Sequence, residues 1–124
     1  MKLGEKEFDR IVQKALRRIP SEIRKHLDNL VISVRKRPSK KMVKEMHLSA
    51  DDTLFGVFEG VPLVERSITS PTLLPDSILL FQEPLEAACE TIEELEEEIE
   101  ITVVHEVAHF IGMSEERLAE LGYS

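Results

Sequence analysis

Hydrophobic positions recur at intervals of three and four residues near the start of the chain. The apolar side chains of this stripe are Phe8, Ile11, Val12, Ala15, Leu16 and Ile19. This spacing places them on one face of an α-helix. Pro20 cannot continue helical hydrogen bonding, so the helix is expected to end just before it. The pattern predicts an amphipathic helix whose apolar face packs against the hydrophobic core.

Three short segments rich in β-branched and aromatic residues come next. They span residues 30–34, 53–58 and 77–81, and the pattern predicts a strand in each. Residues 38–46 are expected to form a short helix. Residues 64–76 show no periodicity and contain two prolines, which predicts a long loop of a kind that often carries function.

The last third of the chain is expected to be helical. Thr91, with Glu94 three residues later, forms the pattern of a capping box at a helix start. From residue 101 to residue 111 the helix is apolar nearly all round, and its polar side chains there are His105, Glu106 and His109. Such a helix is buried, and its polar groups need partners. Gly112 is expected to end it.

The order of these elements predicts the α+β class. We expect a single compact domain over residues 1–124, in which a small sheet of about three strands packs against a long C-terminal helix.

The polar residues of this helix form the motif His105-Glu106-Val107-Ala108-His109, which is HExxH. Residues four apart lie on one face of a helix, so the two imidazoles can bind one metal ion together. Glu106 lies about 100° round the helix from His105, where it can hold a water molecule on the metal. Zn²⁺ lowers the pKa of that water, and the carboxylate acts as general base.

A catalytic zinc site uses a third protein ligand and leaves a position for water. The downstream candidates are Glu115, Glu116 and Glu120, and the string HExxHxxGxxE overlays the metzincin pattern HExxHxxGxxH with Glu115 in the last position. We therefore rank Glu115 first, with Glu116 and the upstream His47 as alternatives.

Several motifs resemble those of a small bacterial family of zincin-like metallopeptidases, described as minimal metzincin-like domains. They are Leu16-Arg17-Arg18-Ile19-Pro20, Phe55-Gly56-Val57-Phe58-Glu59-Gly60-Val61-Pro62-Leu63, Leu74-Pro75-Asp76-Ser77-Ile78-Leu79-Leu80-Phe81, Pro84-Leu85, the segment from Thr102 to Gly112, Glu116-Arg117-Leu118, and Leu121-Gly122-Tyr123.

The resemblance implies a zincin-like fold with His105 and His109 as zinc ligands and Glu106 as general base. It also implies an acidic third ligand, generally an aspartate, where this chain has the longer Glu115. Metzincins carry a methionine turn downstream of the motif. Met113 lies inside the motif instead and cannot take that role.

Two further features are candidates for substrate binding. The strand with Ile78, Leu79 and Leu80 is either an edge to which a peptide substrate adds as an extra strand or an interior strand. The Tyr123 hydroxyl either donates to a developing oxyanion or belongs to a packing residue.

Composition narrows the function further. A net charge of −8 disfavours nucleic acid as a partner. The single cysteine excludes an internal disulfide and a zinc site built on a cysteine pair. No apolar run suits a membrane-spanning helix, and the N-terminus lacks a signal-peptide pattern, so a cytoplasmic protein is expected.

The sequence thus predicts a zinc-dependent metallopeptidase that acts on a peptide or protein and uses Glu106 to activate water. The alternative is a catalytically inactive zincin-like module that binds a metal ion or a partner protein. The oligomeric state cannot be assigned from the sequence.

Overall fold

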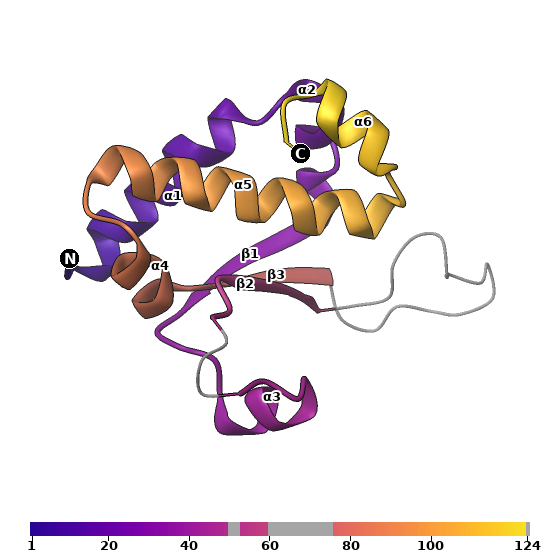
Figure 1. Cartoon of the computed structure of the whole chain (residues 1–124). Helices are drawn as coiled ribbons and strands as arrows, with labels where there is room; N and C mark the ends of the chain where they lie inside the picture. The colour runs from indigo at the N-terminus through magenta and orange to yellow at the C-terminus, as the bar shows by residue number, and fades with distance from the viewer. Residues whose placement is uncertain (50–52, 60–75, 124) are drawn as a thin grey trace.

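The computed structural model describes residues 1–49, 53–59 and 76–123. The elements, in chain order, are α1 (Glu5–Arg18), α2 (Ser21–Arg24), the 3₁₀ turn η1 (Leu27–Asn29), β1 (Leu30–Arg35), α3 (Lys40–Glu45), β2 (Gly56–Glu59), β3 (Asp76–Phe81), α4 (Gln82–Ala88), α5 (Ile92–Ile111) and α6 (Glu115–Glu120) (Figure 1). The α+β class, the small sheet and the long helix near the C-terminus are confirmed. Of the expected loop over residues 64–76, all but the last residue lies outside the described residues.

The three strands pair in the order β1-β3-β2. β1 runs parallel to β3, with Leu30 opposite Asp76, and β2 runs antiparallel to β3, with Phe58 opposite Ile78. β3 therefore has a strand on both sides and offers no edge to a peptide.

The interpretation of Ile78, Leu79 and Leu80 as a substrate-binding edge is wrong, and the interior alternative is confirmed. Their backbone groups are used in pairing with β1 and β2. Ile78 and Leu80 are completely buried, and Leu79 is 6% exposed. In the described part of the chain, β2 and β1 form the two edges of the sheet.

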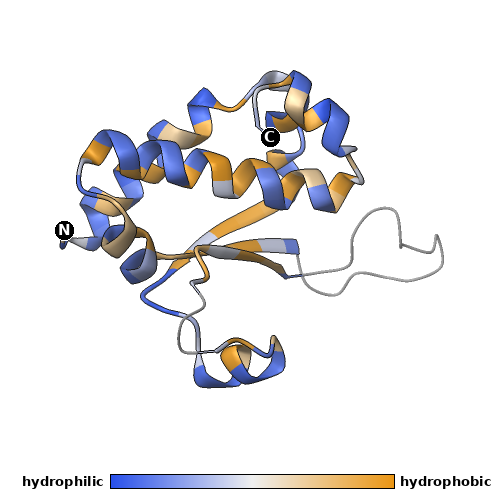
Figure 2. Ribbon diagram, viewed as in Figure 1, coloured by the Kyte–Doolittle hydropathy of each residue, from blue (hydrophilic) through white to orange (hydrophobic). Residues whose placement is uncertain are grey.

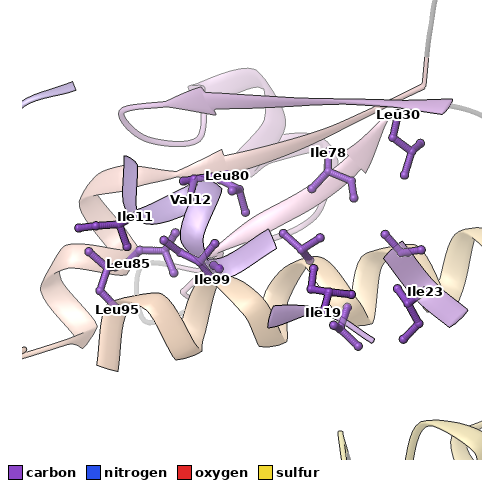
Figure 3. Packing of buried hydrophobic residues seen from close by; sticks show 14 of the residues in the cluster. Ile11, Val12, Ile19, Ile23, Leu30, Ile78, Leu80, Leu85, Leu95 and Ile99 are labelled. Carbon is purple, nitrogen blue, oxygen red and sulfur yellow. The ribbon is translucent and has the colours of Figure 1, made fainter. Parts of the chain in front are cut away.

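The main hydrophobic core lies between the sheet and the two long helices. α1 and α5 pack against each other, and α5 also contacts β2 and β3. Ile78 and Leu80 of β3 join Ile11 and Val12 of α1 and Ile99 of α5 in this core (Figure 3). The stripe predicted on α1 is buried apart from Leu16, which is partly buried. Along both helices, hydrophilic positions alternate with hydrophobic ones, drawn in blue and orange in Figure 2.

The remaining helices stand around this core. α3 lies away from α5, beyond the sheet, while α6 lies near α2 (Figure 1). α4 follows β3 directly, and Pro84 is tolerated because it lies in the first turn of the helix. No helix among the described residues is long and apolar enough to cross a membrane.

The start of the chain is attached to α4 by two buried side chains. The Glu86 carboxylate accepts a hydrogen bond of 2.7 Å from the Leu3 backbone N–H, and the Gln82 amide donates one of 3.0 Å to the Leu3 carbonyl. Gln82 also donates to Glu86 over 3.2 Å. This arrangement fixes the segment that leads into α1.

Candidate metal centre

The HExxH motif lies in the last two turns of α5. The predicted capping box begins the helix: the Thr91 hydroxyl accepts the Glu94 N–H at 3.1 Å. The Glu94 carboxylate reaches back one residue further than expected, to the N–H of Glu90 at 3.1 Å. Gly112 ends the helix as predicted, in the left-handed conformation with φ 70°. Both ends of α5 are therefore set by local sequence.

The three polar residues of the motif differ in their exposure. His105 and Glu106 are partly buried, and His109 is exposed. The two histidines are one helical turn apart, so they project from the same face of α5. His109 and His105 both interact favourably with the Glu106 carboxylate. The helix thus presents a pair of imidazoles with a carboxylate beside them.

Glu106 faces the edge strand β2. Its carboxylate accepts a hydrogen bond from the backbone N–H of Phe58. The rings of Phe58 and Phe110 pack with centroids 4.9 Å apart, which brings the strand against the same part of α5. Burial raises the pKa of Glu106 above its ordinary value, while His109, the Phe58 N–H and His105 oppose that rise. A carboxylate with a raised pKa is better suited to accept a proton near neutral pH.

Gly56 allows β2 to approach α5 closely. A Cβ at this position would lie 2.8 Å from Cγ2 of Thr102 and 2.9 Å from the backbone oxygen of Leu79. Only glycine fits there without a shift of the backbone. Sequence reasoning missed both Gly56 and the Phe58 N–H, although a glycine inside a strand pattern is a recognised sign of close backbone approach.

The outer edge of β2 lies beside Glu106. The Phe81 N–H donates to the Phe55 carbonyl at 2.9 Å, so residues 55 and 81 form a hydrogen-bonded pair. Such pairs alternate along an antiparallel ladder, which makes Phe58 and Ile78 a non-hydrogen-bonded pair. The N–H and C=O of Phe58 therefore point away from β3. The hydrogen bond to Glu106 is consistent with this direction.

A family model of zincin-like metallopeptidases matches residues 27–123, which include the whole three-stranded sheet and the HExxH helix α5. The chain belongs to this family. A search of curated proteins finds no significant match. Family membership supports the expected metallopeptidase class. Zincin-like metallopeptidases generally bind zinc.

The donor set of this zincin-like domain fits zinc in kind, because two imidazoles on one helical turn and nearby carboxylates are ligands that zinc prefers. In the described ranges, no group of three or more His, Cys, Asp or Glu side chains lies together closely enough to hold a metal ion. His105, His109 and Glu115 therefore do not form a closed set in this structure.

The structure places the candidates for the third ligand as follows. Glu115 is the first residue of α6, directly after the N-cap Ser114, and it is exposed. Glu116 is its exposed neighbour. His47 follows the end of α3, and α3 lies on the opposite side of the sheet from α5 (Figure 1). This position separates His47 from the motif and leaves Glu115 and Glu116 as the nearer candidates along the chain.

Tyr123 is held by another part of the zincin-like domain. Its hydroxyl donates to the carboxylate of Glu100, on α5, at 2.5 Å. Burial and this hydrogen bond raise the pKa of Tyr123. The hydroxyl is therefore engaged with a residue outside the HExxH motif, which favours the packing interpretation over an oxyanion donor.

Proposed function

We propose that this zincin-like domain is a zinc-dependent peptidase in which His105, His109 and Glu115 hold the metal. The observation that carries the proposal is the partly buried Glu106 between two histidines of one helix face and the edge strand β2. When bound, zinc would supply Lewis acidity to the substrate carbonyl and to the attacking water.

Glu106 performs the proton transfers in this proposal. Its carboxylate accepts the proton of the attacking water and passes it to the leaving amine. The Phe58 N–H holds the carboxylate against β2, which limits the orientations that Glu106 can adopt. The Phe58–Phe110 contact keeps the strand in that place.

We assign substrate binding to β2 in place of β3. The N–H and C=O of Gly56 and the C=O of Phe58 point to the outer edge of β2, where an extended peptide can add as a further strand, while the Phe58 N–H holds Glu106 at that edge. A peptide on this edge would pass beside Glu106, because Glu106 binds the same edge through Phe58. We therefore infer that the substrates are peptides or proteins.

The first test compares metal content and hydrolysis in three proteins. Wild type and Glu106→Gln should each retain one zinc per chain after zinc loading and desalting, whereas the His105→Ala/His109→Ala double variant should retain none. Of these three proteins, only the wild type should cleave unfolded proteins and a mixed peptide library. Mass spectrometry detects the cleavage products. Glu97→Gln, an exposed change on the same helix, is the matched control and should behave as wild type.

Two results would contradict the proposal. Hydrolysis that persists in Glu106→Gln would remove Glu106 as general base. A wild type that holds one zinc but leaves every substrate intact would favour the non-catalytic module, which would then be sought through a stable protein partner.

A further inference from the structure

α6 is attached to distant parts of the chain through two of its residues, Leu118 and Arg117. Leu118 is 1% exposed and belongs to the main core. Arg117 binds Glu22 of α2 with two nitrogens: Nε lies 2.9 Å from Oε2, and Nη2 contacts Oε1. Arg117 also binds Glu120 within α6 at 2.7 Å. The fork-shaped contact to Glu22 fixes the orientation of the arginine as well as its distance.

A second attachment lies just beyond the end of α6. The Tyr123 hydroxyl donates to Oε2 of Glu100, and Arg18 of α1 lies 2.8 Å from the other oxygen of the same carboxylate. Glu100 is 8% exposed, so this contact is shielded from water. α6 is thus attached to α2 at one point and, through Tyr123, to α5 and α1 at another.

Glu115 differs from its neighbours in this segment. Its side chain is exposed, and within the described part of the chain it has no hydrogen-bond or ion-pair partner. The backbone between His109 and Glu115 is ordered by the turn at Gly112, where the Met113 N–H binds the Ala108 carbonyl at 2.9 Å. The backbone of Glu115 is therefore fixed, while its carboxylate is free to turn.

We propose that Arg117 and Tyr123 are positioning residues: their contacts with Glu22 and Glu100 fix the backbone of α6, so that Glu115 has only its own side chain to turn to complete the metal site. This inference rests on the proposed function, in which Glu115 is the third ligand. Side chains that orient metal ligands typically change metal affinity by about 10- to 100-fold when they are removed.

The test measures zinc affinity by competition with a colorimetric chelator. Arg117→Ala, and Glu22→Gln from the opposite side of the pair, should each weaken zinc binding by about tenfold. Tyr123→Phe, which removes only the hydroxyl, should weaken it in the same direction. Arg117→Lys keeps the charge without the fork and should recover part of the loss.

The matched control is Arg37→Ala. Arg37 also forms a two-point pair with a glutamate, Glu83, at 3.0 and 3.4 Å, and α4, which carries Glu83, lies away from α6 (Figure 1). This variant should bind zinc as the wild type does. Circular dichroism at the assay temperature establishes that each variant is folded.

A double-mutant cycle separates positioning from general destabilisation. In a Glu115→Ala background, Arg117→Ala should cause no further loss of affinity, because the ligand that it positions is already absent. Cobalt(II) loaded in place of zinc gives a second readout: its visible absorption should change in Arg117→Ala in the same way as in Glu115→Ala.

Three outcomes would overturn the inference in distinguishable ways. Wild-type affinity in Arg117→Ala, with weak binding in Glu115→Ala, would overturn the positioning role and keep Glu115 as a ligand. An equal loss with and without Glu115 would make the effect one of general stability. Wild-type affinity in Glu115→Ala would overturn the ligand assignment itself and the positioning role with it.

Discussion

Glu106 is a carboxylate that the fold holds partly out of water next to the edge strand. Because burial raises its pKa above the ordinary value of 4.5, the charged form is less favourable in the folded chain than in the unfolded chain. The contribution of Glu106 to stability therefore falls as the pH rises from below 4.5 through the raised pKa. A carboxylate at this position therefore costs stability at neutral pH.

Glu106→Gln should accordingly stabilise the metal-free protein at pH 7. Glutamine removes the buried charge and keeps an oxygen that can accept the Phe58 N–H. The urea midpoint should be higher than that of wild type at pH 7, and the difference should disappear below about pH 4, where the glutamate is protonated in both states. A difference that does not depend on pH would contradict this account. Glu97→Gln serves as the exposed control.

Gly56→Ala should lower the free energy of unfolding by about 1–3 kcal/mol, the usual cost of overpacking. The added Cβ meets Thr102 and, more importantly, the backbone oxygen of Leu79, which cannot move aside as a side chain does. Urea unfolding of both proteins measures the cost. Gly4→Ala is the control, since nothing lies within 4 Å of a Cβ there. Equal effects of the two substitutions would show that β2 does not need the close approach.

At the scale of elements, the attachment of the first residues to α4 depends on Glu86. Its buried carboxylate accepts hydrogen bonds from the Leu3 N–H and from Gln82. Removal of such an acceptor leaves the partly buried Leu3 N–H and one N–H of the buried Gln82 amide without this partner. The entry into α1 therefore depends on a side chain of a helix that lies far along the sequence.

Glu86→Ala should destabilise the protein by about 2–3 kcal/mol, because the buried carboxylate is the acceptor for the Leu3 N–H and for the buried Gln82 amide. Glu83→Ala, on the same helix, removes only an exposed pair with Arg37 and should cost about 1 kcal/mol or less. Thermal and urea unfolding of both variants compare the two sites. Similar losses would contradict the role given to the Leu3 contact.

The elements themselves could be largely predicted from the sequence, because their signals are local. The stripe of α1 and the limits of α5 at Thr91 and Gly112 rest on neighbouring residues, and the structure confirms them. The second strand begins at Gly56, three residues later than the β-propensity pattern indicated. α4 was not predicted, because it follows β3 without a break and has Pro84 in its first turn.

At the scale of the whole molecule, the proposed zinc binding would be linked to folding stability. A ligand that binds only the folded state at 100 times its dissociation constant stabilises that state by about 2.7 kcal/mol. For a domain of this size, the gain corresponds to a rise of about 10 °C in the melting temperature. Calorimetry should show the rise in wild type, its reversal by EDTA and its absence in the His105→Ala/His109→Ala variant. The same rise in that variant would place the metal elsewhere.

The order of the strands could not be predicted from local sequence. It depends on the pairing of Leu30 with Asp76 and of Phe58 with Ile78, and these partners are distant along the chain. The hydrophobicity of residues 78–81 indicated burial correctly but did not distinguish an edge from an interior strand. The motif located the two histidines and Glu106, since helical spacing alone brings them together. The position of Glu115, the proposed third ligand, depends on how α6 packs, and no spacing rule reports that packing.

The family match begins at residue 27, after α1 has ended. Yet α1 packs along α5, buries Phe8 and Ala15 completely, and pairs Arg18 with Glu100. A fragment cut where the similarity starts would leave that side of the long helix open to water. The limits of recognisable ancestry and the limits of a foldable unit are therefore different here. A fragment that begins at residue 27 would lack α1, and with it the helix that packs along α5.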